Sequence, residues 1–548
     1  MSMEQYRAAQ KAGKKELQTL VAQKLPTEMP ALDAILEHTD ISGEIPLGLV
    51  DIPTELIVGT KTIGRTSSFA PNFMPILGEN TEFAAKWAAL CDAHLREGIR
   101  DPIVAYEYMN HYYVQEGNKR VSVLKFFDAI SVPGYVTRII PAREDTKESR
   151  LYYEFLEFYN ATSINYLFFS KEGSYLHLAY HLGHRRYERW SMDDRIIFRS
   201  CYNRFADAFK ELGGDHLHMT VGDAMLIYLD LFDYNQLKDE TPSEIKENLK
   251  KMWAEFELKN AQETPSVKFD PSPVQKKNIL TKLLSPSEEE TITRIAFINR
   301  KTPETSSWTY AHELGRLYLK DAFHGTVQTK AYDDISGTDN AITAIEQAIA
   351  DGYEMIFTTS PEFLSASLRA AVNHPEVKIL NCSLNSSHKY IRTYYGRMYE
   401  AKFLIGVLAG IMTDTNKIGY IADYPIYGMT ANINAFALGV KMVNPKAKIY
   451  LEWSTLKENE HVDLTAKLYS MGATYISHQD MIIPRKITRQ FGLFRVNGET
   501  PVNLAFPAWN WGKYYERIIR NVQNGIWNTE EKSDANKALH YWWGMSSD

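Results

Sequence analysis

The feature that most constrains the fold is a regular alternation of short apolar runs and amphipathic stretches after residue 291. Repeated units of this length build a parallel sheet with helices on both faces. A second set of units begins at Lys417, so we expect two lobes, and ligands bind such sheets outside the carboxyl ends of the strands. The predicted strands are RIAFIN (294–299), GYEMIFTT (352–359), KILNC (378–382), KIGYIA (417–422), KIYLE (448–452) and ATYIS (473–477).

Composition narrows the class of protein. The chain has 548 residues, of which 44% are hydrophobic and 24% charged, as in globular proteins of about three to four domains. A net charge of -7 argues against a general nucleic-acid coat. Cys91, Cys201 and Cys382 form no CxxC pair, which argues against a disulfide framework and a zinc ribbon.

Segments that would direct the chain to a membrane are not visible in the sequence. The first residues contain no apolar core of a signal peptide. The longest apolar run, Phe403 to Met412, is about half the length that spans a bilayer. We therefore expect a cytoplasmic protein without a transmembrane segment.

Shifts in composition predict four regions. Residues 1–144 combine β-rich runs with helical stretches, and residues 145–258 are helical and rich in aromatic side chains. Residues 259–290 carry four prolines among Lys, Ser and Glu, as a surface linker does. Residues 291–548 hold the strand–helix units and a tail. We therefore predict a multidomain α/β protein.

The region from Tyr399 to Trp453 carries a set of spaced residues: Glu400, Gly406, Ala409, Lys417, Gly419, Phe436, Gly439, Val440, Asn444 and Pro445. This pattern resembles the basic membrane protein family, the PnrA-like purine-nucleoside receptors that serve ABC transporters as substrate-binding components. Ala466–Ile476 and Tyr514–Trp527 resemble the closing elements of that family, so the resemblance covers Thr291 to Trp527. It implies a type I periplasmic-binding-protein fold with two lobes, a hinge and a nucleoside-like ligand in the cleft.

Several binding positions depart from the family pattern. Where the family has an acidic residue and an SFN segment, this sequence has Asn299, Ser307 and Trp308. The family's GVD, whose Asp holds the ribose hydroxyls, falls on residues 492–494 with Phe494 in place of Asp, and its late Lys falls on Trp509. Phe cannot bind hydroxyl groups, so the polar groups of such a ligand would be left unpaired.

We expect the cleft to be lined by aromatic side chains that hold a flat ring and by polar side chains that recognise its edge. The alternative is that the aromatic side chains pack between the lobes without touching a ligand. The predicted ligand-binding residues are Asn299, Ser307, Trp308, Phe363, Asp423, Tyr424, Trp453, Gln479, Asp480 and Trp509.

The first region contains an Arg-bearing loop, a helix, a GI-x-x-PI strand, a hairpin and the box Glu116–Arg120. This order resembles the ParB/sulfiredoxin-like fold, whose relatives bind nucleotides. Gly117 permits close approach of a ligand, and the helix that follows directs free N–H groups at an anion. We predict a phosphate or nucleotide site and, as the alternative, a solvated basic helix start. The site would contain Arg65, Glu116, Gly117, Asn118, Lys119 and Arg120.

Signals for catalysis or metal binding are weak. The family box has an acidic or His residue where Asn118 stands, which counts against hydrolysis. His177, His181 and His184 share a helical face but lack the carboxylate of an HExxH motif. We found no P-loop, GxGxxG, GxSxG or convincing helix-turn-helix. We therefore predict no catalytic residue, no metal and no cofactor beyond a nucleotide at the box.

The leading hypothesis is a cytoplasmic sensor, not an enzyme, that binds a nucleoside-like or other flat polar ligand and couples this binding to the ParB-like domain. One alternative is a nucleotide hydrolase or switch in the ParB-like domain that the C-terminal module regulates. Another is an ABC-transporter substrate-binding component. Nucleic acid is not the favoured partner, and a homo-oligomer is an alternative to a monomer.

Overall fold

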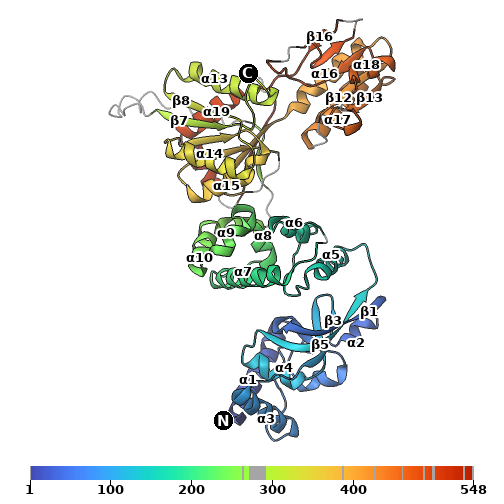
Figure 1. The fold of residues 1–548 in the computed structure, drawn as a ribbon, viewed down its shortest axis with the longest axis vertical. Coiled ribbons are helices and arrows are strands. Elements are labelled where there is room, and N and C mark those ends of the chain that lie inside the picture. Colours follow the sequence, from blue (N-terminus) through green and yellow to red (C-terminus); the bar gives the residue numbers. More distant parts are fainter. Residues whose placement is uncertain are drawn as a thin grey trace. The chain divides into compact units, whose positions relative to one another are not determined.

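In the computed structural model the chain forms two compact units, Met1–Asn203 with Met219–Leu226, and Arg204–His218 with Ile227–Asp548 (Figure 1). The boundary between these units passes through helices α7 and α8 of the predicted helical region. The residues that the structure describes are 2–186, 188–261, 265–270, 292–384, 388–423, 427–459, 461–485, 488–496, 500–534 and 537–545.

The first unit begins with an α+β region built on a five-stranded sheet of order β1-β5-β3-β4-β2. Along β3, buried and half-buried residues alternate, as expected for a strand that packs one face on a core. The order of loop, helix, strand, hairpin and box is the order predicted, whereas the ParB/sulfiredoxin-like assignment stays a prediction. The elements are α1 (Ser2–Ala22), α2 (Leu32–Leu36), β1 (Ile41–Pro53), β2 (Ile57–Thr60), α3 (Glu82–Glu97), β3 (Ile103–Tyr108), β4 (His111–Glu116), α4 (Asn118–Phe126) and β5 (Ser131–Pro141).

The predicted helical region is helical in the structure. Thr146 caps α5, and Thr241 and Glu244 form a capping box at the start of α10, so hydroxyl and carboxylate side chains satisfy the first N–H groups. The helices are α5 (Lys147–Thr162), α6 (Ser174–His181), α7 (Met192–Glu211), α8 (Val221–Leu231), α9 (Tyr234–Asp239), α10 (Pro242–Lys251) and α11 (Trp253–Ala261).

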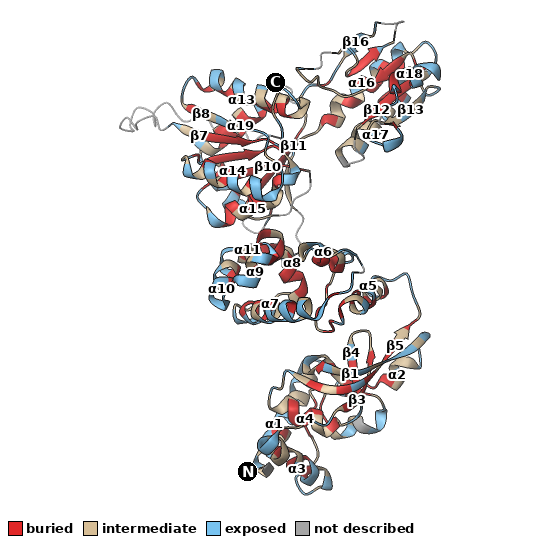
Figure 2. Ribbon diagram, viewed as in Figure 1, coloured by how far each residue is buried: buried red, intermediate tan, exposed pale blue. Residues whose placement is uncertain are grey.

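Lobe I of the second unit is a parallel sheet of order β6-β17-β11-β10-β9-β7-β8. Its central strands are buried (Figure 2); α13 packs with α19, and α14 packs with α15 (Figure 1). The elements are β6 (Ser266–Lys268), β7 (Thr293–Ile298), α13 (Ser307–Phe323), β8 (Val327–Tyr332), α14 (Thr338–Ala350), β9 (Met355–Thr358), α15 (Leu364–Asn373), β10 (Lys378–Cys382), β11 (Arg392–Gly396), α19 (Trp511–Gln523), α20 (Ile526–Ser533) and β17 (Leu539–Trp543).

Part of the predicted linker over residues 259–290 belongs to regular structure. The end of α11 and strand β6 fall inside this range, and β6 pairs with β17 near the end of the chain. Residues 262–264 and 271–290 lie outside the described residues. The Lys- and Ser-rich composition concealed an edge strand, because an edge strand needs little apolar surface.

Lobe II is a smaller sheet of order β13-β12-β14-β15-β16, in which the first three strands are parallel. Its first two helices pack so closely that only glycine fits at residue 406. A Cβ at Gly406 would lie 2.1 Å from the carbonyl oxygen of Phe436. The glycine pattern of the family resemblance therefore has a packing cause. The elements are α16 (Met398–Met412), β12 (Lys417–Ala422), α17 (Tyr427–Val443), β13 (Lys448–Trp453), α18 (Leu464–Ser470), β14 (Tyr475–Ser477), β15 (Leu493–Arg495) and β16 (Val502–Ala505).

The chain passes between the lobes after β11 and again before α19, and these two passages touch. A Cβ at Gly396 would lie 2.6 Å from the ring of Trp509. Beyond β17, the N–H of Met545 donates to Glu400 Oε2 at 2.7 Å. The predicted α/β architecture with two lobes is therefore confirmed, and the segments that connect the lobes lie against each other.

Candidate functional site

Polar side chains meet at the carboxyl ends of β7 and β9 in lobe I. Asn299 follows β7 and is 1% exposed. Its Nδ2 donates to Asp333 Oδ1 at 2.8 Å, and its Oδ1 accepts from Thr359 Oγ1 at 2.8 Å. Burial raises the pKa of Asp333, while the bond from Asn299 opposes that change. Asn299 thus takes part in a closed hydrogen-bond layer beneath this edge of the sheet.

The neighbouring strand β10 brings two further polar residues to the same edge. Asn381 Nδ2 donates to Thr358 Oγ1 at 2.8 Å and to the carbonyl of Ser360 at 2.9 Å. The side-chain oxygens of Asn381 and Ser383 are buried and have no hydrogen-bond partner among the described residues. Buried polar atoms are satisfied in nearly all native proteins, so these two oxygens are side-chain acceptors at this edge whose hydrogen bonding is incomplete.

An aromatic cluster lies beside this edge and consists of Trp308, Tyr395, Trp509 and Trp511. The Trp509 ring stacks on Trp511 with centroids 5.0 Å apart, and meets Trp308 and Tyr395 edge-on at 5.5 and 5.4 Å. Trp308 Nε1 donates to the carbonyl of Thr359 at 2.7 Å, which links the cluster to the polar layer. Trp308, Tyr395 and Trp509 are half-buried, so they pack together and still present surface.

A buried histidine supports the aromatic cluster from below. His312, on α13 one turn after Trp308, is 1% exposed and stacks on Trp511 at 4.5 Å. Its Nδ1 is hydrogen-bonded to the Tyr515 hydroxyl, whereas its Nε2 has no partner among the described residues. Burial lowers the pKa of His312 to about 3. The imidazole is therefore neutral near pH 7.

Lobe II presents a second set of polar side chains at the ends of β12 and β14. Asp423 follows β12, and its Oδ1 accepts from Ser454 Oγ at 2.9 Å. His478 follows β14; its Nδ1 is buried without a partner among the described residues. Burial lowers the pKa of His478, and the nearby Asp423 opposes this change. A ligand group that donates or accepts a proton could complete the bonding of this ring.

Asp480 is held by a buried cation. Lys402 Nζ on α16 forms an ion pair with Asp480 Oδ1 and lies 3.4 Å from Ser477 Oγ. The side chain of Lys402 is 2% exposed. Burial raises the pKa of the Asp480 carboxyl, and Lys402 opposes this change. Asp480 therefore fixes α16 to the end of β14 through its Oδ1.

The remaining predicted ligand-binding residues lie in different environments. Phe363 is fully buried and has no exposed face for stacking, and Trp453 packs on the core of lobe II. Ser307 opens α13, where Ser306 is the cap. The backbone carbonyl of Gln479 accepts from Gly492 at 2.6 Å. Tyr424 lies outside the described residues.

The structure also brings to these edges residues that the sequence analysis missed. The sequence carries a signal for two of them, since Asn381 is a polar residue inside an apolar strand and Lys402 is a charged residue inside an apolar helix. The neighbouring sequence carries no signal for the others. The missed residues are His312, Asp333, Thr359, Asn381, Ser383, Tyr395, Lys402, His478 and Trp511.

In the first unit, the predicted phosphate box forms the start of α4. Gly117 has φ +104° and precedes Asn118, the first helical residue. Arg120 Nη1 donates to the carbonyls of Asp101 and Pro102 at 3.0 and 2.6 Å. The guanidinium therefore holds the preceding loop.

The other members of the box have mixed environments. Lys119 Nζ lies 4.8 Å from the ring centre of Phe83, and Glu116 is exposed at the end of β4. Asn118 is buried, and its Oδ1 has no partner among the described residues. The side chain of Arg65 lies outside the described part.

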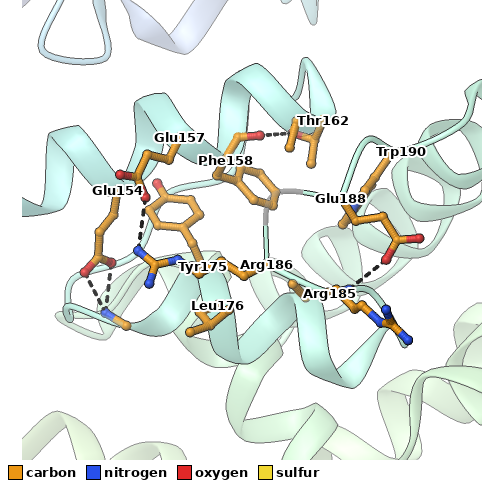
Figure 3. Close-up of a pocket in the computed structure, with 13 residues that line it drawn as sticks. Glu154, Glu157, Phe158, Thr162, Tyr175, Leu176, Arg185, Arg186, Glu188 and Trp190 are labelled. Carbon is orange, nitrogen blue, oxygen red and sulfur yellow. Dashed lines mark hydrogen bonds and ion pairs between the residues drawn. The ribbon is translucent and has the colours of Figure 1, made fainter.

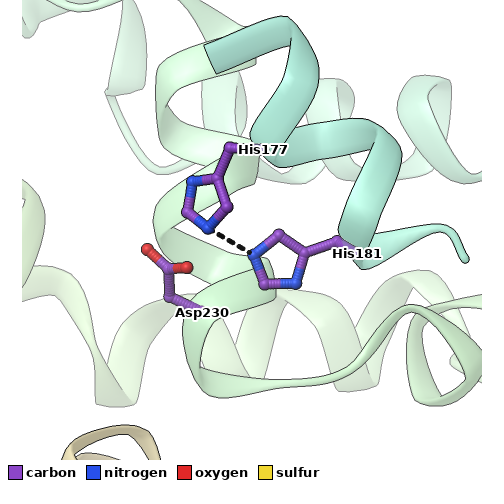
Figure 4. A group of neighbouring side chains, drawn as sticks. All are labelled: His177, His181 and Asp230. Carbon is purple, nitrogen blue, oxygen red and sulfur yellow. Dashed lines mark hydrogen bonds between the residues drawn. The ribbon is translucent and has the colours of Figure 1, made fainter. Parts of the chain in front are cut away.

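The three histidines of the helical region do not gather. The Nε2 atoms of His177 and His181 on α6 lie 3.1 Å apart (Figure 4). His184 instead stacks on Trp190 at 4.8 Å. Asp230, also drawn in Figure 4, belongs to the other compact unit. Within the first unit, α6 ends at His181 and thus offers a pair of imidazoles instead of the three-histidine face that the sequence spacing indicates.

A cavity of about 220 Å³ lies between α5, α6 and the loop before α7 (Figure 3). Its walls are mostly apolar, with Phe158, Tyr175 and Trp190 among them. The carboxylates at its rim are engaged, because Glu154 accepts from the N–H of Gly173 and Glu157 lies 3.5 Å from Arg186. The cavity therefore combines mostly apolar walls with carboxylates that are already paired.

Comparison with known proteins identifies one region of the chain. Residues 292–484 match the model of the family described as "ABC transporter substrate-binding protein PnrA-like". The predicted resemblance of the C-terminal half to this family is confirmed. Within the described residues, no helix combines the length and apolar character needed to cross a bilayer.

The segments that match individual relatives span about half of the chain. A purine-binding protein of Brucella abortus (strain 2308) is 26% identical over 263 residues, which are 46% of this chain and 72% of that protein. A protein of Haloferax volcanii that carries the name ABC transporter glucose-binding protein is 24% identical, over 48% of this chain and 66% of its own. A solved solute-binding protein from Conexibacter woesei has a TM-score of 0.35 and 15% identity, covering 42% of this chain and 81% of that one.

Proposed function

We propose that the C-terminal module binds a nucleoside-like or other flat polar molecule between the carboxyl ends of its two sheets. The observation that carries this proposal is the set of buried polar atoms without partners among the described residues at these edges: Asn381 Oδ1 and Ser383 Oγ in lobe I, and His478 Nδ1 in lobe II. Ligands bind α/β sheets at these strand ends, and a ligand with donors at its edge would satisfy the two oxygens.

The aromatic cluster supports a flat ligand. Trp308, Tyr395 and Trp509 are half-buried beside the polar edge, and aromatic faces bind planar rings by stacking. Phe494, at the position of the family's ribose-binding Asp, is fully buried in the lobe II core. We therefore infer that recognition centres on the ring and does not use a carboxylate at residue 494.

The names of the relatives agree with a small polar ligand and differ in its identity, since one protein is named for purine binding and the other for glucose binding. The aromatic surface favours the first class. A thermal-shift panel of purine bases, nucleosides, nucleotides and glucose on the full chain separates them, because a ligand stabilises the folded state by RT ln(1 + [L]/Kd).

Trp308→Ala should weaken binding of the best compound of that panel by about 1–3 kcal/mol, the scale of aromatic–base stacking. Trp308→Phe keeps an aromatic face and loses the bond from Nε1 to Thr359, so it is the matched control and should retain most of the affinity. Titration calorimetry gives both values. Unchanged affinity in a folded Trp308→Ala protein would remove Trp308 from the site.

We also propose that this binding is sensed and passed to the N-terminal α+β region in the cytoplasm. Cys91, Cys201 and Cys382 are buried and form no disulfide, which agrees with a reducing compartment. Cell fractionation tests the location. Recovery with membranes through a transporter would instead favour the alternative of an ABC-transporter component.

A nucleotide at the box of α4 is a second candidate, favoured by the positive φ of Gly117 and by the buried, unpartnered amide oxygen of Asn118. Rotation of that amide would direct N–H groups to an anion. Calorimetry of the full chain with ATP, CTP and GTP should show binding that Lys119→Ala weakens. Product formation would indicate the hydrolase alternative, and the absence of heat would exclude the site.

A further inference from the structure

The outer surface of α16 and α17 in lobe II is unusually apolar. Seven large apolar side chains of these helices are each between 37% and 66% exposed. Soluble monomers expose single apolar residues often but contiguous apolar patches rarely, and such patches mark interaction sites. We call these residues the lobe II patch: Leu404, Leu408, Ile411, Met412, Leu438, Met442 and Val443.

The patch is continuous because the two helices touch through glycine. A Cβ at Gly439 would lie 2.1 Å from the carbonyl oxygen of Phe403 and 3.0 Å from the N–H of Val407. Phe403 and Val407 are half-buried at this junction. Leu404, Leu408 and Ile411 recur at the spacing of one face of α16, and Leu438 and Met442 at that of one face of α17. The result is a broad layer of two helices instead of two separate ridges.

Charge is nearly absent from this layer. Lys441 is the one charged residue that is exposed among the described side chains of α16 and α17. Lys402 is buried against Asp480, and Glu400 is paired with Arg397 at 2.8 Å. The whole chain, by contrast, is 24% charged and carries a net charge of -7.

We propose that the lobe II patch is the interface of a two-fold symmetric homodimer. In such an interface each copy presents the same surface, so the surface must be complementary to itself. The seven side chains of the patch meet this condition, because they carry no charge that would be buried against the same residues of the second copy, and Lys441 is the exposed charge beside them among the described side chains. Two helices from each copy would then form a four-helix contact, and Met412 and Met442 supply side chains that adapt to it.

A membrane surface is the competing occupant, and the structure disfavours it. Anionic membranes attract apolar helices that carry several Lys or Arg residues on the polar flank. The exposed part of this helix pair offers Lys441 alone among its described side chains. The dimer therefore accounts for the composition of the surface better than a bilayer does.

Light scattering after size-exclusion chromatography tests the proposal on the full chain. We expect a mass of twice 62.9 kDa at micromolar concentration. Leu408→Glu with Leu438→Glu should raise the dissociation constant by at least about 100-fold, because unpaired charges would be buried. The matched control, Leu314→Glu with Leu317→Glu on α13, changes residues that are similarly exposed and should leave the dimer intact.

Charge complementation gives a second, independent readout. A protein with Leu408→Lys and Leu438→Lys should be monomeric alone and should form a heterodimer when mixed with the Glu variant. A monomeric wild-type chain would overturn the proposal, as would a dimer that the Glu variant leaves unchanged. Wild-type monomers that bind phosphatidylcholine–phosphatidylglycerol vesicles through the patch would also overturn it, in favour of a membrane.

Discussion

Protonation of His312 should destabilise lobe I below pH 6.5. Its imidazole is buried between Trp511 and the Tyr515 hydroxyl, and burial lowers its pKa to about 3. An unfolded chain has a His pKa of about 6.5. Between these two values the unfolded state binds the proton more readily, so the free energy of unfolding falls as the pH decreases and is constant above about pH 7.

The magnitude follows from the two pKa values. From pH 7 to pH 5.5, one histidine of this kind lowers the free energy of unfolding by about 1.3 kcal/mol. His540, on β17 of the same lobe, has a pKa lowered by burial to about 4 and should add about the same amount over this interval. We therefore expect lobe I to lose about 2.5 kcal/mol from these two groups.

Urea unfolding of the full chain, followed by hydrogen-exchange mass spectrometry of α13 and α19 peptides, reports lobe I separately. His312→Gln can keep a hydrogen bond to Tyr515 but cannot titrate, so it should lose about half of the pH dependence assigned to the two histidines. His324→Gln changes an exposed histidine at the end of the same helix. It is the control and should keep the full pH dependence of unfolding. An unchanged pH dependence in His312→Gln would refute the reasoning.

Two further substitutions test the packing of lobe II. Gly406→Ala should lower the free energy of unfolding by about 1–3 kcal/mol, because the added Cβ would meet the Phe436 carbonyl. Gly43→Ala is the control, since no atom lies within 4 Å of its added Cβ. Equal effects of the two substitutions in hydrogen exchange would contradict close packing at Gly406. Lys402→Met should lower the free energy of unfolding by about 3–5 kcal/mol, because it leaves the Asp480 carboxylate buried without its cation. Adding Asp480→Asn should restore part of that loss in urea unfolding, and a further additive loss would argue against the pair.

The parallel strands in the centre of each lobe were predictable, because their apolar runs are continuous. The predicted strands at residues 378–382 and 417–422 coincide with β10 and β12. The edge strands were not predictable. β6 lies in a Pro- and Lys-rich stretch and pairs with β17, so its partner is more than 250 residues away and leaves no local signal.

The polar residues at the strand ends of the candidate site were visible in the sequence, whereas the hydrogen-bond and ion-pair partners of these residues were not. The family resemblance predicted Asn299, and the polar residue after an apolar strand predicted Asp423. Whether an aromatic residue near a strand end faces the core or the ligand edge depends on how the next helix begins. Phe363 turned into the core, whereas Trp308 stayed half-buried. The pairing of Lys402 with Asp480 joins residues 78 positions apart, and only the folded chain brings them together.

Calorimetric titration of the full chain with the most stabilising compound of the panel tests the central claim most directly. Ser383→Ala and His478→Ala each remove one unpartnered polar atom, the first in lobe I and the second in lobe II, and each should weaken binding about 10-fold or more. Ser122→Ala in the other unit, where Ser122 accepts from Trp87, is the control and should leave the affinity unchanged. Equal affinity in all four proteins would contradict a ligand site at the strand ends of the two lobes.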